Sequence, residues 1–241
     1  MTDSSSHARP RWLLLVSVAS LAILAGSVVL GVSFVVGRRA PGVVQVVGAA
    51  TVPFTSDVVK WRVTLKRSAA VGGEVAGYTR LAEDRTRFLA GLQDAGVGRE
   101  DVSVQPVTTS PRFNRDGEET GVDVRQSFLV VSHDVDAVEA LALDPGGLVR
   151  DGLALEGSTL EYFYDDMATL KRSLLRQARE DAGARAGEIA GDRLGDLMEA
   201  RAGVFQIREP YSTEVQGYGM YSTATRKKEM TVTVHAVFGV R

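Results

Sequence analysis

The longest hydrophobic run of the chain covers residues 12–36, twenty-five consecutive positions without a charged side chain. Two arginines precede it, Arg9 and Arg11, and two follow it, Arg38 and Arg39. At a rise of 1.5 Å per residue, about 20 apolar residues cross the hydrocarbon core of a bilayer. The run therefore predicts an uncleaved, single-pass transmembrane anchor over residues 12–36. A cleaved signal peptide is the alternative. Such peptides, however, have a shorter apolar core and a small-x-small cleavage site, and the end of this segment lacks such a site.

The charges that flank the anchor are too evenly balanced to fix its orientation. Only charges in short segments beside the membrane influence orientation, and the free amino terminus adds one charge to the first side. We therefore expect residues 1–11 to form a cytoplasmic tail by a weak preference. Residues 37–41 then form a linker, and residues 42–241 form one domain on the other side of the membrane.

Beyond the linker the hydrophobic pattern becomes that of strands. Residues 43–47 predict a first strand, and residues 48–53 predict its frayed end and a turn. A second strand begins at Asp57. Its alternation predicts one buried face and one solvated face: Val59, Trp61, Val63 and Leu65 point one way, and Lys60, Arg62, Thr64 and Lys66 the other.

Three segments have helical periodicity: residues 73–95, 135–143 and 166–190. In the first, Glu83, Asp84, Arg85 and Arg87 are expected outside, with the apolar positions inside: Val75, Tyr78, Leu81, Phe88, Leu89 and Leu92. Asp165 or Asp166 is expected to cap the third, longest helix. The apolar stripe of that helix is mostly alanine in its second half, so its backbone is expected to lie close to a sheet: Met167, Leu170, Leu174, Ala178, Ala182, Ala186 and Ile189.

Five further strands complete the pattern, over residues 102–107, 122–130, 153–163, 197–207 and 230–240. A polar hairpin loop is expected at residues 112–121 and another loop at residues 210–223. The strands follow one another as neighbours and hairpins and do not alternate with helices. The predicted fold class is therefore α+β, with mostly antiparallel sheets and packed helices, preceded by one transmembrane helix.

Composition narrows the chemistry of the part that follows the anchor. From residue 37 onward there are 26 basic and 29 acidic residues, since Arg9, Arg11 and Asp3 lie in the tail. This near balance argues against a nucleic-acid partner. The chain has no cysteine. Structural disulfides, thiol catalysis and thiolate metal sites are therefore excluded.

No motif in the chain predicts a catalytic residue, a metal site or a cofactor. The three histidines have no HExxH-type spacing, and there is no Walker loop, G-x-S-x-G elbow or G-x-G-x-x-G. His133 lies in a polar turn that is expected to cap the next helix, and His235 is expected to point outward from a strand. A small-ligand or hydrolytic domain is the alternative function. It would be indicated by a pocket lined by His133, Asp134, Asp136 or the pair Asp165 and Asp166.

Aromatic residues offer the best candidate for an interaction site. Of the three at the end of one strand, Phe163 is expected in the core and Tyr162 or Tyr164 at the surface. The loop at residues 210–221 places further aromatic rings among glycines, a composition suited to contact surfaces. The predicted interaction residues are Tyr211, Tyr218, Met220 and Tyr221. An ordinary hairpin tip is the alternative.

Several short sequence segments, in their order along the chain, resemble the SIMPL-domain family, which consists of bacterial proteins of unknown function. They lie at residues 48–65, 92–97, 100–104, 155–163, 171–190, 194–197 and 202–207. The resemblance implies an α+β domain that is exported to the periplasm or the outside. It also implies a ring-like homo-oligomer in some members and an association with stress resistance. It supplies no catalytic residues.

Anchor, composition and resemblance lead to one expectation. The chain is expected to be a non-enzymatic, single-pass protein of the inner, cytoplasmic membrane. Its domain is expected on the periplasmic side, where it self-associates or docks on a membrane or envelope complex. Its expected partners are the membrane, through residues 12–36, and either further copies of itself or another membrane component.

Overall fold

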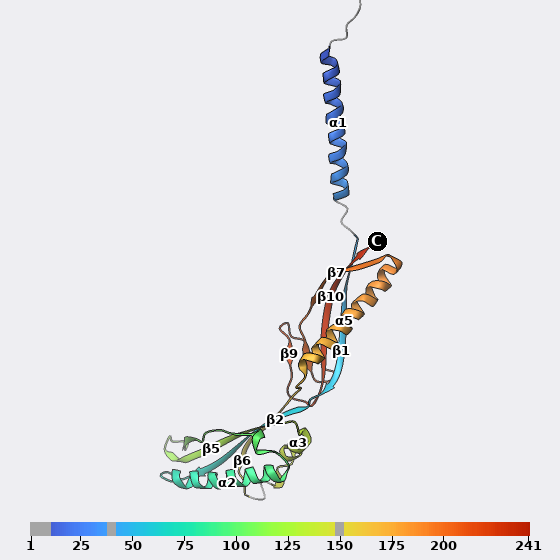
Figure 1. Ribbon diagram of the computed structural model, residues 1–241. Helices are drawn as coiled ribbons and strands as arrows, with labels where there is room; N and C mark the ends of the chain where they lie inside the picture. Colours follow the sequence, from blue (N-terminus) through green and yellow to red (C-terminus); the bar gives the residue numbers. More distant parts are fainter. Residues whose placement is uncertain (1–10, 38–41, 148–151) are drawn as a thin grey trace, which may run out of the picture.

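The computed structural model describes residues 11–37, 42–147 and 152–241, without the side chains of residues 11–19 and 34–37. The chain forms helix α1 (Arg11–Gly37) and two lobes (Figure 1). Within the part of the chain that is described, no helix has the length and apolar character that crossing a membrane requires. The anchor over residues 12–36 therefore stays a prediction. The predicted tail and linker, except residues 11 and 37, lie outside the described residues.

Lobe A contains sheet A and one helix. The sheet has the order β1-β10-β8-β9, with β7 also pairing β10, and every pairing is antiparallel except that of β8 with β9. The 3-10 turn η2 (Gly191–Arg193) connects helix α5 to β7. The elements are β1 (Val43–Thr55), α5 (Met167–Ala190), β7 (Leu194–Ala202), β8 (Gln206–Arg208), β9 (Met220–Tyr221) and β10 (Lys227–Val240).

Helix α5 packs closely on sheet A, as its alanine stripe predicted. Ala178, Ala182 and Ala186 are fully buried. A Cβ atom at Gly48 would lie 2.1 Å from the carbonyl oxygen of Ala178, so only glycine fits where the helix crosses β1. The turn predicted over residues 48–53 was wrong, because β1 continues to Thr55 in unbroken register with β10. The glycine marks the helix crossing and does not end the strand.

Lobe B contains sheet B and two helices, inserted between β1 and α5. The sheet has the order β3-β5-β2-β6, with β4 also pairing β5, and all of these pairings are antiparallel. The 3-10 turn η1 (Arg99–Asp101) leads into β3. The elements are β2 (Val58–Ala69), α2 (Glu74–Asp94), β3 (Val102–Val104), β4 (Thr108–Phe113), β5 (Glu119–Ser132), α3 (Val135–Leu143) and β6 (Leu155–Phe163).

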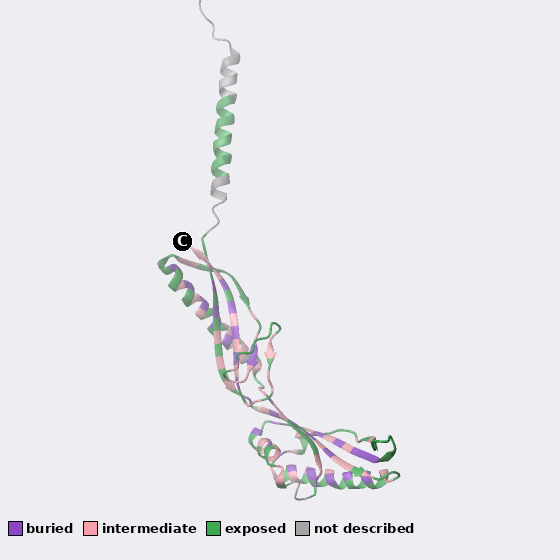
Figure 2. Ribbon diagram, turned by 180° about the vertical axis from the view of Figure 1, so that it is seen from behind, coloured by how far each residue is buried: buried purple, intermediate pink, exposed green. Residues whose placement is uncertain are grey.

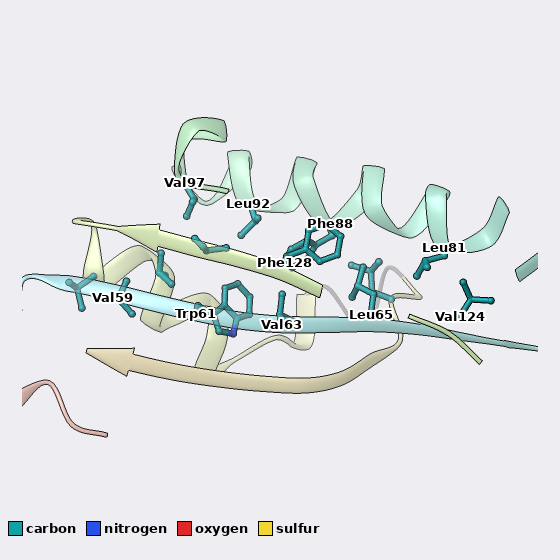
Figure 3. Packing of buried hydrophobic residues seen from close by; sticks show 14 of the residues in the cluster. Val59, Trp61, Val63, Leu65, Leu81, Phe88, Leu92, Val97, Val124 and Phe128 are labelled. Carbon is teal, nitrogen blue, oxygen red and sulfur yellow. The ribbon is translucent and has the colours of Figure 1, made fainter. Parts of the chain in front are cut away.

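Each lobe has its own core, and Figure 2 shows buried residues in both. In lobe B, Phe88 of α2 lies between Trp61 and Phe128, with ring centroids 5.8 Å and 4.8 Å away (Figure 3). Helices α2 and α3 contribute to the same buried cluster, so both cover the same face of the sheet. The predicted alternation of β2 is confirmed, since Val59, Trp61, Val63 and Leu65 are all fully buried.

The predicted burial of α2 was wrong at three positions. Val75 and Tyr78 are exposed, whereas Asp84 is fully buried. Arg67 of β2 explains the buried carboxylate, since its Nε donates to Asp84 Oδ2 at 2.5 Å and its Nη2 donates to Oδ1 at 2.8 Å. A bidentate pair of this kind compensates the carboxylate for its lost hydration.

Four further predictions were wrong. The polar hairpin loop predicted over residues 112–121 is shorter, because β4 continues to Phe113 and β5 begins at Glu119. Ile189 is exposed, and Ala190 completes the buried stripe of α5 instead. The strand predicted over residues 197–207 is divided into β7 and β8, which pair with different parts of β10. At the end of β6, Tyr162 is buried in the core of lobe B, whereas Phe163, expected in the core, is only partly buried, as is Tyr164. The α+β class with mostly antiparallel sheets is confirmed.

Candidate functional site

In each lobe the helices cover one face of the sheet, α5 in lobe A and α2 and α3 in lobe B. No described helix covers the opposite face of either sheet. We call these surfaces outer face A and outer face B. Outer face A contains the odd-numbered residues 43–51 of β1, their partners at odd positions 231–239 of β10, and Met198, Glu199 and Arg201 of β7. Outer face B contains the even-numbered residues 60–68 of β2 and their partners on β5 and β6.

Outer face A is largely uncharged. Strand β1 has no charged residue, and its positions on this face are all exposed. Val43 and Val47 are each 43% exposed, and Met198 lies against Gly239 with 58% of its surface exposed. A shallow hollow of about 430 Å³ lies on the face. It is lined by Gln45, Glu199, Arg201, His235 and Val237.

The free edge of β1 is protected along only part of its length. Val240 N donates to Gly42 O, so the even-numbered residues of β1 bond to β10 and the odd-numbered ones face the edge. In the second half, Ala49 N donates to Asp181 Oδ2 of α5 at 2.8 Å, and Pro53 has no N–H. Both are common protections of an edge strand. The first half, residues 43–47, combines an open edge with exposed valines.

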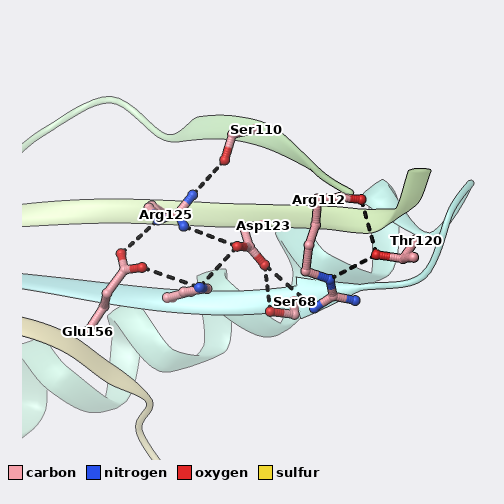
Figure 4. Close-up of polar contacts among 8 residues, drawn as sticks. Ser68, Ser110, Arg112, Thr120, Asp123, Arg125 and Glu156 are labelled. Atoms are coloured by element: carbon pink, nitrogen blue, oxygen red, sulfur yellow. Dashed lines mark hydrogen bonds and ion pairs between the residues drawn. The ribbon is translucent and has the colours of Figure 1, made fainter. Parts of the chain in front are cut away.

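Outer face B is occupied by ion pairs (Figure 4). Asp123 contacts Lys66 and Arg125, each at 3.0 Å, and accepts a hydrogen bond from Ser68 Oγ at 2.6 Å. Glu156 contacts Arg125 at 2.7 Å and Lys66 at 3.3 Å. The Ser68 hydrogen bond, then that of Lys66, lowers the pKa of Asp123 to about 2. This network satisfies its charges within the sheet.

The loop between β8 and β9 separates the four predicted interaction residues into two pairs. Tyr211, at φ 66°, and Tyr218 are almost wholly exposed. Met220 and Tyr221 form β9, and the Tyr221 ring stacks on Phe163 with centroids 6.1 Å apart. Two of the residues therefore present free rings, while the other two hold the loop against the sheet and lobe B.

A buried lysine joins the two lobes. Lys228 Nζ, at the start of β10, donates to Ser56 Oγ at 2.9 Å and to Tyr162 O at 2.8 Å. The Tyr162 hydroxyl donates to Glu139 Oε1 at 2.8 Å, which also ties α3 to the junction. Burial lowers the pKa of Lys228 to about 8. The residue therefore holds three segments together at the cost of a desolvated amine.

A serine beside a lysine with a lowered pKa resembles a nucleophile and its base, but the surroundings of Ser56 and Lys228 do not support catalysis. Ser56 is 2% and Lys228 is 1% exposed, which leaves a substrate no access. The amide N–H of Ser56 donates to Arg226 O, and that of Asp57 donates to Phe163 O. No oxyanion donor is therefore free at the two amides next to the hydroxyl. The geometry fits a structural junction.

Three of the acidic residues that could have lined a pocket have structural roles, whereas Asp165 is exposed. Asp134 Oδ1 accepts from Ala137 N and caps α3, as predicted, and Asp166 Oδ1 accepts from Thr169 N and caps α5. Asp136 pairs with Arg226 Nη1 at 2.5 Å. His133 and His235 are exposed. Among the described residues, no group of three or more His, Asp and Glu side chains is placed to hold a metal ion.

Comparison with protein families identifies the domain. The model of the SIMPL family, described as a protein of unknown function (DUF541), matches residues 44–238. The chain belongs to the SIMPL family. A comparison with curated proteins gave no match. The match begins in β1 and ends in β10, so the SIMPL domain includes both lobes and both outer faces.

Two features of this SIMPL domain were not predicted from the sequence. Outer face A could have been suspected, because a strand of valine, glutamine, alanine and threonine without any charge is unusual for a solvated surface. The role of Lys228 had no such signal, since it is one of two adjacent lysines at the start of a strand. Only the contact with Ser56 and Tyr162, far away in the sequence, distinguishes it from Lys227.

Proposed function

We propose that this SIMPL protein is a non-enzymatic, membrane-anchored protein of the bacterial envelope that assembles with copies of itself through outer face A. In this proposal residues 12–36 span the inner membrane and the domain lies on the periplasmic side. The assembly is the functional form, and the family association with stress resistance fits an assembly of this kind in the envelope.

One observation carries the proposal: outer face A combines exposed apolar side chains with an unprotected strand edge. Val43, Val47 and Met198 are exposed on this face, next to the open half of β1. Exposed apolar surface beside an unpaired edge is typical of interaction sites in folded proteins. A solvated face of an antiparallel sheet normally carries polar residues, as outer face B does.

The position of this surface along the chain supports the proposal. Five residues separate Gly37, the last residue of α1, from Val43, so the chain takes six residue-to-residue steps between them. A fully extended chain of that length reaches about 20 Å. If α1 spans the membrane, the open half of β1 lies close to it, where anchored copies share two dimensions and meet at high local concentration.

The mass of the full chain in detergent tests the proposal. We expect light scattering during size-exclusion chromatography to give a multiple of 25.8 kDa after correction for bound detergent. A chain mass of 25.8 kDa at every concentration would contradict self-association.

Docking on another membrane component is a second candidate, favoured by the same open edge. An edge strand can accept a strand from a different protein as readily as one from a second copy. In that case the isolated chain is monomeric, and substitutions on outer face A abolish co-purification of the partner without changing the mass of the isolated chain.

A further inference from the structure

A cavity of about 470 Å³ lies between sheet A and the loop that follows β8. Its walls come from β8, β10 and the two loops beside β8. Gln206 holds the loop over the cavity, since its Nε2 donates to Gln216 O at 2.6 Å. Cavities of this size accommodate small organic ligands. The lining includes Val204, Gln206, Arg208, Val215, Thr231 and Thr233.

Arg208 is the only charged residue among those that line this cavity. Its Nη1 donates to Glu214 O at 3.3 Å and its Nη2 to Thr231 Oγ1 at 3.5 Å, both long contacts. Its Nε is buried and has no hydrogen-bond partner among the described residues. No carboxylate of the described chain lies within 4 Å to form an ion pair with it.

Arg226 also has a buried Nε without a hydrogen-bond partner in the described part of the chain, but carboxylates neutralise its charge. Its Nη1 pairs with Asp136 at 2.5 Å and with Glu139 at 3.2 Å. Arg67, which reaches the fully buried Asp84, forms a bidentate pair with it. Arg208 alone of these three keeps an unneutralised guanidinium beside a cavity.

We propose that this cavity binds a small carboxylate with a short aliphatic tail. The carboxylate pairs with the guanidinium of Arg208 in the two-pronged geometry that Arg favours for such groups. The tail lies along Val204 and Val215, whose side chains are 45% and 71% exposed without a ligand. Glycines at positions 217 and 219 give the covering loop the freedom to adjust. Thr231 and Thr233 line the cavity and also belong to outer face A, but they pair with Thr51 and Ala49, away from the open half of β1 at residues 43–47.

Fluorine NMR with 4,4,4-trifluorobutanoate as the probe tests the site on the full chain in nonionic detergent. We expect saturable broadening of the probe signal, and little broadening of the matched alcohol, 4,4,4-trifluorobutan-1-ol. Micelles without protein correct both titrations for partition into detergent. In Arg208→Gln the dissociation constant is expected to rise at least tenfold. In Arg115→Gln, which removes one charge from an exposed hairpin tip of lobe B, it stays unchanged.

A pair of variants at an exposed position keeps the test decisive even if Arg208→Gln fails to fold. Val215→Glu places a carboxylate of the chain at the mouth of the cavity and is expected to displace the probe, whereas Val215→Gln leaves probe binding intact. Equal binding of acid and alcohol, or equal binding by Val215→Glu and Val215→Gln, would overturn the proposal. A smaller assembly in Arg208→Gln would also overturn it, because the guanidinium would then serve a contact between copies.

Discussion

The two outer faces are both antiparallel sheet surfaces without a helix, yet they expose different chemistry. Outer face B presents the linked pairs of Lys66, Asp123, Arg125 and Glu156, which satisfy one another and remain hydrated. Outer face A presents mainly valine, alanine and threonine, together with Gln45 and His235 and, at one margin, the ion pair of Glu199 with Arg201. Since both belong to one domain, the difference does not reflect overall composition. It supports the proposal that copies assemble through outer face A and that outer face B faces solvent.

The two faces also differ in what they contribute to stability. If copies assemble through outer face A, we expect the ion pairs of outer face B to stabilise the isolated chain and the apolar side chains of outer face A to contribute mainly to assembly. Substitutions on face B should therefore change the free energy of unfolding, and those on face A should change assembly. Four experiments test this separation.

The largest effect is expected from a charge placed on outer face A. Val47 and Val131 are a matched pair, each 43% exposed and each on an outer face. Val47→Lys is expected to weaken assembly by roughly a hundredfold or more, because an unpaired ammonium is costly to desolvate. Val131→Lys lies beside hydrated charges and should leave the mass unchanged. Light scattering over a concentration series measures both, and equal effects would remove the distinction between the faces.

The second effect concerns the network of outer face B. Asp123→Asn is expected to lower the free energy of unfolding by about 2 kcal/mol at pH 7 without changing the mass. The pKa of Asp123 is lowered to about 2, so its contribution is present above about pH 4 and is lost as the pH falls toward 2. Denaturant unfolding between pH 2 and pH 7 should show a weaker acid dependence in the variant. An unchanged acid profile would mean that the network does not stabilise the sheet.

The third experiment concerns Lys228, which lies at the junction of the two lobes and on neither outer face. The pKa of Lys228 is about 8 in the fold, against 10.5 as its ordinary value, so the unfolded chain binds more protons between these values. Stability is therefore expected to rise by about 1 kcal/mol from pH 7 to pH 9. Lys228→Met should abolish this rise and leave the mass unchanged. The same rise in the variant would show that another group causes it.

The smallest effect is expected at the loop between β8 and β9, which contains Tyr211 and Tyr218, and at the adjoining β9. Tyr218→Ala plus Tyr221→Ala is expected to weaken assembly by less than about tenfold without unfolding the domain, and an unchanged mass would exclude the loop as a contact. The two single variants separate the roles. Tyr218 is free, so its substitution should change only assembly, whereas Tyr221 stacks on Phe163 and its substitution should also cost about 1 kcal/mol of stability.

Local signals allowed much of the fold to be predicted. The helix over residues 135–143 was predicted with the bounds it has, because Asp134 caps its start and a proline and two glycines follow its end. The alternation of β2 correctly identified its buried face, and Asp166 caps α5 as expected. Each of these features depends on residues that are neighbours in the sequence.

The features that were missed depend on distant residues. Gly48 lies within a strand because α5 crosses it, about 130 residues later. Asp84 is buried because Arg67 reaches it from another element. The division into two lobes depends on the pairing of β1 with β10, at opposite ends of the domain. For the same reason outer face A was missed, since only the position of α5 decides which side of β1 remains uncovered.

Cross-linking of single cysteines tests the central claim most directly, because the chain contains no cysteine of its own. Val47→Cys and Val131→Cys place one thiol on each outer face at equal exposure. With a short bis-maleimide added to membranes that contain the full chain, we expect covalent dimers from Val47→Cys and only monomers from Val131→Cys. Dimers from Val131→Cys alone, or from both variants equally, would contradict outer face A as the surface through which copies assemble.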